Sequence, residues 1–420
     1  MIRTASKPVS KRLRLSLQIA LATTFVSLST GCVGTANRGA ELAPVASAEA
    51  QESNEAGSTV QALVNLGPRV AGTPTAEQAS QYLIDEYRKA GYQTQVQTFT
   101  YSKFRDEGST ITVDGTPLEG QALNGTIAGK ATTPLVAVPN VGRPADFANL
   151  PVNGRIAIVQ RGEIPFTQKA ENAAKAGAVG LIIVNTEGGT LRGTLTGKPT
   201  IPVVALSRDQ GNPLRDRAQA MPTTVSLVVN AEERTITGRN VIAYLDGVTQ
   251  PTVLIGGHFD SVAGSPGAND NASGTAVTLD LARRMAKTPL ARQAWFVAFD
   301  GEEDGLKGSR AFVEAAQPQF LSGLKAMLNF DMVGVNQQLQ IGGSSSLTAI
   351  AQPKASIPKS VVNGSSDHAA FAAKNVPVLF FYRGSDANYH TPNDKTVDPK
   401  LLNETSQTAM DIVQQILKVD

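Results

Sequence analysis

Four short apolar segments in the C-terminal half of the chain are each followed directly by acidic or histidine side chains. Together with one further apolar segment, they predict strands at 241–245, 253–257, 295–299, 326–330 and 376–381. Helical periodicity is found near 273–286, 308–316 and 399–418. Strands that alternate with helices predict an α/β fold with a mainly parallel, mixed sheet and helices on both faces. Ligands bind beyond the carboxyl ends of the strands in such sheets, so the polar residues there are expected to form one site.

The polar residues that follow these strands have the chemistry of metal ligands. They are His258, Asp260, Asp270, Asp300, Glu302, Glu303, Asp331, Tyr389 and His390. Any one of the acids could simply cap a helix, but so many carboxylates at one edge would repel one another unless cations neutralised them. Imidazole and carboxylate ligands suit zinc, with manganese or cobalt as substitutes. The ligands outnumber those of a single catalytic zinc, which favours two ions with Asp270 as the candidate bridge.

The only cysteine, Cys32, lies at the end of a predicted export signal. Five cationic side chains between residues 3 and 14 precede an apolar stretch at 15–29 that is short for a membrane span. The sequence Leu28-Ser29-Thr30-Gly31-Cys32 resembles a bacterial lipoprotein cleavage site. This resemblance implies lipidation of Cys32 and a location in the cell envelope, at the outer membrane, in the periplasm or at the cell surface. Plain secretion and an inert thiol are the alternatives.

Composition limits the partners and the metal chemistry. The formal charge of the full chain is +2, and removal of residues 1–31 takes away five cationic side chains and no acidic ones, which leaves −3. Nucleic acid is therefore not an expected partner, because binding to phosphates needs clustered positive charge. One cysteine among 420 residues excludes a thiolate zinc cluster and an internal disulfide. The oligomeric state is not indicated by the sequence.

Changes of pattern along the chain predict five segments. Residues 1–32 are the lipoprotein-type signal, and 33–57 are rich in Ala, Glu, Ser and Gly, as in a flexible tether. Residues 58–113 and 230–420 form two parts of a catalytic domain. Residues 114–229, with recurring short apolar runs and a helix at 167–176, form a small β-rich insert. Within this insert, Gln160-Arg161-Gly162 and Gly180-Leu181-Ile182-Ile183 resemble the protease-associated domain.

The motifs of the catalytic region resemble a known enzyme family. They are Gly257-His258-Phe259-Asp260-Ser261, Gly267-Ala268-Asn269-Asp270-Asn271, Gly301-Glu302-Glu303, Asn329-Phe330-Asp331-Met332 and Tyr389-His390-Thr391. In this order they are similar to the co-catalytic di-zinc aminopeptidases of clan MH, and Leu66-Gly67-Pro68-Arg69 resembles the start of that family. Members of the family can carry an inserted protease-associated domain, as expected here.

The resemblance implies a role for each matching residue. One zinc ion would be held by His258, Asp270 and Asp331, and the other by Asp270, Glu303 and His390. Glu302 would be the general base that deprotonates a metal-activated water, and Asp260 would accept the imidazole N–H of His258. Tyr389 would stabilise the oxyanion. Asp367 and His368, in a matching Ser-Asp-His segment, would line the substrate pocket without binding metal.

Removal of N-terminal residues from peptides is the function that these roles favour. A carboxypeptidase or dipeptidase is the alternative on the same scaffold, and it should present a cation to the terminal carboxylate, for which Arg383 and Lys395 are the candidates. A binding module that keeps the fold without catalysis should have lost ligands, whereas the predicted set is complete. A single-zinc acyl transfer such as glutaminyl cyclisation is a further alternative.

Overall fold

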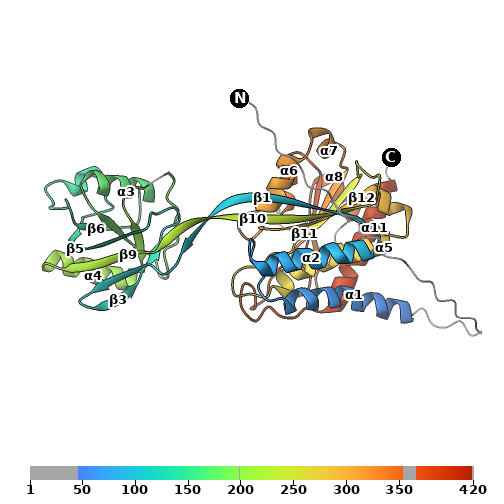
Figure 1. Ribbon diagram of the computed structural model, residues 1–420, viewed down its shortest axis with the longest axis horizontal. Helices are drawn as coiled ribbons and strands as arrows, with labels where there is room; N and C mark the ends of the chain where they lie inside the picture. The colour runs from blue at the N-terminus through green and yellow to red at the C-terminus, as the bar shows by residue number, and fades with distance from the viewer. Residues whose placement is uncertain (1–45, 198, 353–365, 419–420) are drawn as a thin grey trace, which may run out of the picture. The chain divides into compact units, whose positions relative to one another are not determined.

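The computed structural model describes residues 46–197, 199–352 and 366–418 (Figure 1). The predicted signal at 1–32, its Cys32, and residues 33–45 of the predicted tether lie outside these ranges. None of the described helices combines the length and the apolar character needed to cross a membrane.

A central sheet organises the catalytic region. Within the described ranges it has seven strands in the order β1-β10-β12-β11-β13-β15-β14. They are β1 (Gln93–Asp106), β10 (Ala231–Tyr244), β11 (Val253–His258), β12 (Ala294–Phe299), β13 (Ala326–Phe330), β14 (Gln340–Gly343) and β15 (Val378–Tyr382). The neighbours β12, β11, β13 and β15 run parallel, while β1, β10 and β14 pair in antiparallel fashion. The predicted α/β class with a mainly parallel, mixed sheet is confirmed.

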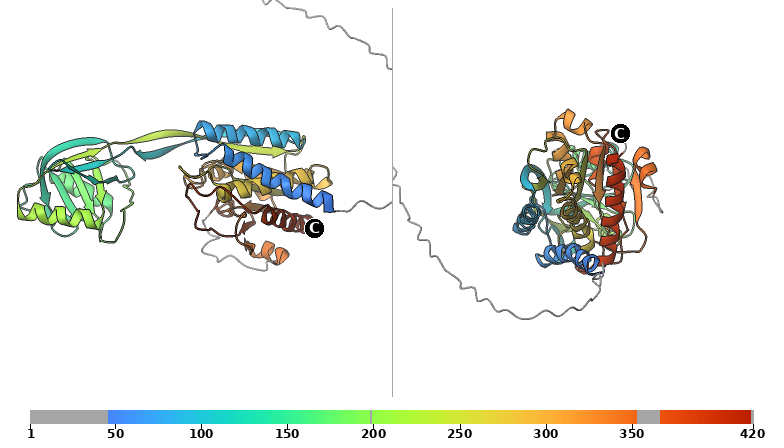
Figure 2. Two further views of the ribbon diagram at one scale, coloured as in Figure 1. Left: turned by 90° about the horizontal axis from the view of Figure 1, so that it is seen from below. Right: turned by 90° about the vertical axis from the view of Figure 1, so that its right-hand side faces the viewer.

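Helices cover both faces of this sheet (Figure 2). One face carries α1 (Ala46–Asn65), α2 (Pro74–Lys89), η2 (Ala268–Ser273), α5 (Gly274–Met285), η3 (Pro289–Gln293), α8 (Ser345–Ala351) and α11 (Pro399–Lys418). The other face carries α6 (Lys307–Ala315), α7 (Pro318–Ser322) and α10 (His368–Ala372). The division follows the alternation of side chains along each strand. In β11, for example, Val253 and Ile255 pack toward the first group of helices and Leu254 toward the second.

Helix α1 begins at Ala46, so the predicted flexible tether is wrong for residues 46–57. Buried side chains recur along the helix every three or four residues and share an apolar cluster with α5 and α11; they are Ala56, Val60 and Leu63. A Cβ at Gly57 would lie 3.2 Å from Pro399 Cγ, at the start of α11. The small residues that indicated a tether therefore allow two helices to pack closely.

Replacing Leu63 by alanine should destabilise the protein by about 2–5 kcal/mol, the usual cost of deleting a fully buried leucine side chain. The free energy of unfolding, measured in urea, checks this value. Gln61→Ala on the exposed side of α1 is the matched control and should change stability by less than about 0.5 kcal/mol. Equal effects of the two substitutions would show that α1 is not part of the core.

The insert has its own sheet, which within the described ranges has the order β3-β2-β9-β5-β6-β7-β8-β4. Its strands are β2 (Thr110–Val113), β3 (Thr116–Glu119), β4 (Gln121–Ala122), β5 (Gly129–Ala137), β6 (Ile156–Gln160), β7 (Gly180–Val184), β8 (Val203–Leu206) and β9 (Thr224–Val229). Its helices are η1 (Pro144–Phe147), α3 (Phe166–Lys175) and α4 (Arg208–Ala220). Alternate side chains of β7 fill separate apolar clusters on its two faces, as expected for a sheet buried on both sides.

The predicted start of the insert at residue 114 is wrong, because β2 belongs to the insert. Residues 110–113 pair with β3 and β9, and Ile111 is fully buried in an apolar cluster of the insert. Asp114 and Gly115 both have positive φ, at 50° and 80°, and form the tight turn that folds β2 back onto β3. The predicted boundary therefore fell inside a hairpin.

Candidate metal centre

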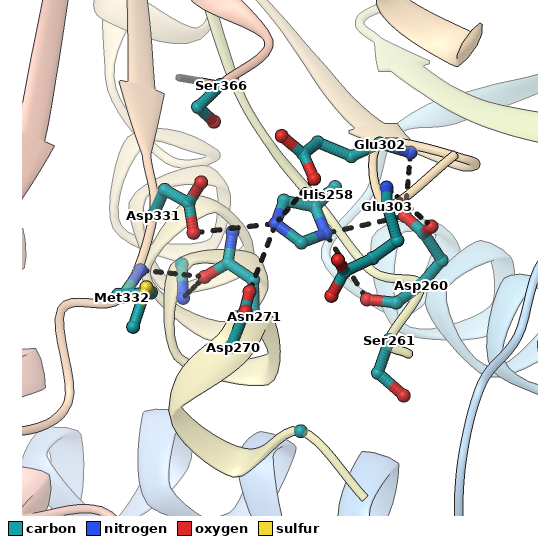
Figure 3. A network of polar contacts seen from close by, with 12 residues as sticks. His258, Asp260, Ser261, Asp270, Asn271, Glu302, Glu303, Asp331, Met332 and Ser366 are labelled. Carbon is teal, nitrogen blue, oxygen red and sulfur yellow. Dashed lines mark hydrogen bonds and ion pairs between the residues drawn. The ribbon is translucent and has the colours of Figure 1, made fainter. Parts of the chain in front are cut away.

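The metal ligands predicted from the sequence come together at the carboxyl edge of the central sheet. Figure 3 shows His258, Asp270, Glu303 and Asp331 there. The ends of β11, β12, β13 and β15 and the loops that follow them supply His258, Glu302, Glu303, Asp331 and His390. Asp270 comes from η2, directly before α5. Because these four strands are parallel, their carboxyl ends lie side by side, and distant parts of the chain converge there.

One group of ligand atoms comes from His258, Asp270 and Asp331. Among the described residues these atoms lie within 4.8 Å of one another. His258 Nε2 is 3.4 Å from Asp270 Oδ1 and 3.4 Å from Asp331 Oδ1. All three side chains are buried, so the group lies beneath the surface.

A second group combines Asp270 with Glu303 and His390, again within 4.8 Å among the described residues. His390 Nε2 is 3.0 Å from Asp270 Oδ2 and 3.4 Å from Glu303 Oε2. The side chain of His390 is 37% exposed, so this group lies nearer to solvent than the first. Asp270 offers one carboxylate oxygen to each group, which is the arrangement of a bridging ligand.

The unsatisfied atoms at this place fit bound cations. Within the described part of the chain, His258 Nε2, Glu303 Oε1 and Asp331 Oδ1 are buried without a hydrogen-bond partner. Buried polar atoms without a partner are rare, because burial removes their hydrogen bonds to water and nothing replaces them. Burial, together with the nearby charge of Asp270, raises the pKa of Glu303 to about 8. Bound cations would lower this pKa and keep the carboxylates ionised. A ligand set of imidazole nitrogen and carboxylate oxygen atoms suits zinc.

The loop that carries Asp270 is fixed against β13 by Asn271. The Asn271 side chain donates to the carbonyl of Phe330 at 2.9 Å and accepts from the N–H of Gly274 at 2.8 Å. A Cβ at Gly274 would lie 2.1 Å from the Phe330 oxygen, so only glycine allows this approach. These contacts therefore fix the position of Asp270 relative to Asp331, which directly follows Phe330.

Asp260 holds the backbone of both glutamates as well as the histidine. Its carboxylate accepts hydrogen bonds from the N–H groups of Glu302 and Glu303, each at 3.2 Å. His258 Nδ1 is 3.2 Å from the backbone oxygen of Asp260 and 3.4 Å from its Oδ1. The sequence pointed to the contact with the imidazole, whereas the contact with the glutamate loop appears only in the structure.

Asp394, which the sequence analysis did not single out, clamps the Asp270 loop. Its carboxylate accepts from the N–H groups of Asn269 at 2.8 Å and Asp270 at 3.1 Å. Its backbone oxygen accepts from the N–H of Ala268 at 3.1 Å. Because Asp394 lies four residues after His390, it ties the loop of His390 to the loop of Asp270. Its nearness to the Tyr389-His390-Thr391 motif was the one clue in the sequence.

Replacing Asp394 by asparagine should weaken zinc binding by about 10–100-fold, the usual effect of losing a group that orients metal ligands. The carboxamide nitrogen cannot accept the second N–H. Competition with a chromogenic chelator measures the zinc affinity. Asp398→Asn is the control, because that exposed carboxylate likewise accepts a backbone N–H, from Lys400. Equal zinc affinities for the two variants would refute the clamp.

Arg69, from the segment that resembles the start of the family, orders the loop between β11 and η2. It is fully buried, and its guanidinium donates to the carbonyls of Phe259 at 2.6 Å and Gly267 at 2.9 Å, and also to that of Pro266. Burial lowers the pKa of Arg69 to about 10, and Asp260 and Asp270 oppose this change. Arg69 thus remains a cation next to the acidic cluster.

Glu302 belongs to neither ligand group. Its Oε2 is 3.9 Å from His258 Nε2, and its side chain is 12% exposed. Burial, opposed by His258 and reinforced by the charges of Asp331 and Asp367, raises the pKa of Glu302 to about 10. Cations in the two ligand groups would lower this pKa and leave Glu302 ionised.

A cavity of about 200 Å³ opens on these carboxylates. Its described lining residues are Asp270, Glu302, Glu303, Asp331, Met332, Phe380, Tyr382, Ser385 and Tyr389. Acidic groups therefore form one side, and apolar or aromatic groups form much of the rest. Tyr389 is 43% exposed, and its ring stacks on that of His390 with centroids 3.8 Å apart.

Asp367 and His368 are not among the described residues that line this cavity, so their role in the substrate pocket stays a prediction. Both side chains are fully buried at the start of α10. The His368 ring stacks on Phe380 with centroids 4.4 Å apart, and Phe380 does line the cavity. The segment therefore supports the cavity wall from behind, because α10 packs against the sheet.

A sheet edge that gathers imidazole and carboxylate ligands around a cavity, with one carboxylate left outside both ligand groups, is typical of metal-dependent hydrolases. Comparison with known proteins narrows this class. The family model described as peptidase family M28 matches residues 240–413, and the PA domain model matches residues 131–214.

Three relatives illustrate the similarity. The "Probable lipoprotein aminopeptidase LpqL" of Mycobacterium tuberculosis is 35% identical over 352 residues, which are 77% of this chain and 69% of that protein. The solved aminopeptidase from Aneurinibacillus sp. strain AM-1 has a TM-score of 0.69 and 32% identity, and the match covers 87% of this chain and 93% of that one. BSAP, a zinc aminopeptidase from Bacillus subtilis, has a TM-score of 0.66 and 27% identity over 86% and 94%.

The chain belongs to peptidase family M28 and is a metallo-aminopeptidase with an inserted PA domain. The resemblance inferred from the sequence motifs is confirmed, and the similarity to BSAP, described as a zinc aminopeptidase, supports zinc as the metal.

Proposed function

We propose that this protein removes N-terminal residues from peptides with two zinc ions that share Asp270, and with Glu302 as the general base. The observation that carries the proposal is the placement of the two Asp270 oxygens, one in each ligand group. His258 and Asp331 would complete the first zinc site, and Glu303 and His390 the second. Zinc, when bound, supplies polarisation of the scissile carbonyl and a water that loses its proton near neutral pH.

Glu302 would move the proton during hydrolysis. Its carboxylate lies at the cavity beside the first ligand group and is not needed as a ligand there. It would take the proton from the attacking water and then return it to the nitrogen of the departing amine, so that the protein ends in its starting state. The N–H contacts from Glu302 and Glu303 to Asp260 would hold the carboxylate in place.

Tyr389 would stabilise the negative charge that develops on the carbonyl oxygen. Burial raises the pKa of the Tyr389 phenol, and Asp270 raises it further, so the hydroxyl remains protonated at neutral pH. A protonated phenol can donate a hydrogen bond to an oxyanion in the cavity. Its exposed position at the cavity rim supports this role.

The cavity lacks a cation that could bind a carboxyl terminus. Its described lining contains no lysine or arginine, which favours cleavage at the amino terminus over cleavage at the carboxyl terminus. Of the two cations that a carboxypeptidase could have used, Lys395 is not among the described residues that line the cavity, and Arg383 is buried. Its guanidinium donates to Thr405 Oγ1 at 3.2 Å and to the carbonyl of Gln337 at 2.5 Å, and it pairs with Glu404 at 3.1 Å. Arg383 is therefore engaged in contacts with α11 and is not available to bind a substrate carboxylate.

Mass spectrometry of peptide products tests this proposal. One peptide is offered with a free and with an acetylated amino terminus, each with and without a chelator. We expect stepwise loss of N-terminal residues from the free peptide only, abolished by the chelator. Trimming of the acetylated peptide from its carboxyl end would instead establish a carboxypeptidase. Absence of cleavage from a zinc-loaded protein would favour the non-catalytic binding module.

We also infer that the mature protein is a lipoprotein of the cell envelope, anchored through Cys32. The export signal and the cleavage-site pattern support this, as does the similarity to LpqL, which is described as a probable lipoprotein aminopeptidase. Mass spectrometry of the mature amino terminus would detect a diacylated or triacylated Cys32. An unmodified amino terminus in the culture medium would show secretion instead.

A further inference from the structure

The loop that carries Glu302 and Glu303 is contacted by side chains of β1 as well as by Asp260. Asp304 directly follows Glu303. Its Oδ2 accepts a hydrogen bond from Tyr101 Oη at 2.5 Å, and its Oδ1 is 2.5 Å from Lys103 Nζ. Both partners come from β1, a strand far away in the sequence. We call Tyr101, Lys103 and Asp304 the β1 anchor.

The β1 anchor is too enclosed to be an ordinary surface ion pair. The side chain of Asp304 is 11% exposed and that of Lys103 is 32% exposed. Burial raises the pKa of Tyr101, and its hydrogen bond to Asp304 raises it further, so the phenol remains a donor. Tyr101 and Lys103 are two positions apart in β1, and their side chains therefore share one face of the strand. One carboxylate is thus held by two donors from the same strand.

Tyr101 also fits closely against both ends of the glutamate loop. A Cβ at Gly301 would lie 3.3 Å from Tyr101 Oη, and Gly301 has a φ of 71°, which favours glycine. At the other end, Lys307 Nζ lies 5.6 Å from the centroid of the Tyr101 ring. The phenol therefore touches the loop before Glu302 and after Glu303.

Strand β10 holds the same loop at its two ends. The Asp300 carboxylate accepts from the N–H of Arg239 at 2.8 Å. The Asn240 side chain accepts from the N–H of Asp300 at 3.1 Å and donates to the carbonyl of Gly308 at 2.9 Å. Strands β1 and β10 pair along their whole length, from Gln93 with Tyr244 to Asp106 with Ala231. The chain enters the insert along β1 and returns along β10.

We propose that Tyr101, Lys103 and Asp304 are positioning residues that set the loop of Glu302 and Glu303, which makes the strand pair leading into the PA insert part of the catalytic framework. This inference rests on the proposed roles of the two glutamates. Without the contacts of Tyr101 and Lys103, Asp304 would no longer fix the residue next to Glu303. The loop would then be held by Asp260 and, at its two ends, by β10. Small displacements of catalytic groups cost rate more than binding.

Tyr101→Phe is the sharpest test, because it removes one hydroxyl and keeps the ring. We expect kcat to fall by about 10–100-fold with KM changed less than about threefold, as for other groups that orient a catalytic site. Tyr92→Phe is the matched control, since the buried Tyr92 Oη donates to the carbonyl of Ala282 at 2.8 Å, on α5. This control loses an equivalent hydrogen bond and should keep its kcat. Melting temperatures of both variants measure the purely structural cost.

Lys103 provides a second test with a built-in rescue. Lys103→Met should lower kcat, and Lys103→Arg should restore most of it, because arginine keeps the charge beside Asp304. Tyr101→Phe with the same kcat as Tyr92→Phe, together with a fully active Lys103→Met, would overturn the positioning role. This outcome would leave the proposed function intact, because the unsubstituted protein would still cleave peptides with a free amino terminus. If the proposed function itself were wrong, the unsubstituted protein would show no metal-dependent cleavage.

Discussion

Replacing Glu302 by glutamine is expected to lower kcat by about two to four orders of magnitude, the usual contribution of acid–base catalysis, without loss of zinc. The carboxamide keeps the shape of the side chain but cannot take a proton from water. Because Glu302 lies outside both ligand groups, with Oε2 3.9 Å from His258 Nε2, the metal sites should be unaffected. Peptide cleavage gives kcat, and elemental analysis gives the zinc content.

Glu314→Gln is the control for this experiment, because Glu314 is an exposed acid on α6. It should change neither kcat nor zinc content. A fully active Glu302→Gln variant would remove the general-base role. A variant that loses zinc would show instead that Glu302 is a ligand.

Replacing Asp270 by alanine should reduce the bound zinc to less than half and abolish cleavage. Its two oxygens take part in both ligand groups, at 3.4 Å from His258 Nε2 and 3.0 Å from His390 Nε2. Removal of a shared ligand therefore affects both groups at once, whereas removal of His390 should affect only one. Zinc per chain is measured by elemental analysis after gel filtration.

Asp386→Ala is the matched control, since Asp386 is an exposed carboxylate in the loop before His390. Circular dichroism of the Asp270 variant separates loss of ligands from loss of fold. If a folded Asp270→Ala protein kept the zinc content of the Asp386→Ala control, the bridging role would be refuted.

The sequence predicted best those elements whose side chains are buried in a regular pattern. The predicted bounds 326–330 and 399–418 coincide with β13 and α11. Strand β13 is buried along its whole length and is apolar except at Asn329, and α11 has a continuous apolar face. Strand β10 was expected only from residue 241, yet it begins at Ala231. Its first half contains Glu232, Glu233 and Arg234, which are exposed and depend on pairing with β1. Such a strand has no local apolar pattern.

The candidate metal ligands could be predicted because each follows an apolar strand or lies in the loop entering a helix. The residues that hold these ligands could not, because their contacts join distant positions. Asp394 bonds to Asn269 and Asp270 across more than a hundred residues, and Asp304 bonds to Tyr101 across two hundred. An acid in a loop looks the same in the sequence whether it faces solvent or clamps another loop.

The two-ion centre is tested most directly by anomalous X-ray scattering at the zinc absorption edge from crystals of the zinc-loaded protein. The account predicts two peaks, one among His258, Asp270 and Asp331, and the other among Asp270, Glu303 and His390, with an Asp270 oxygen next to each. A single peak, or two peaks that do not share Asp270, would contradict it.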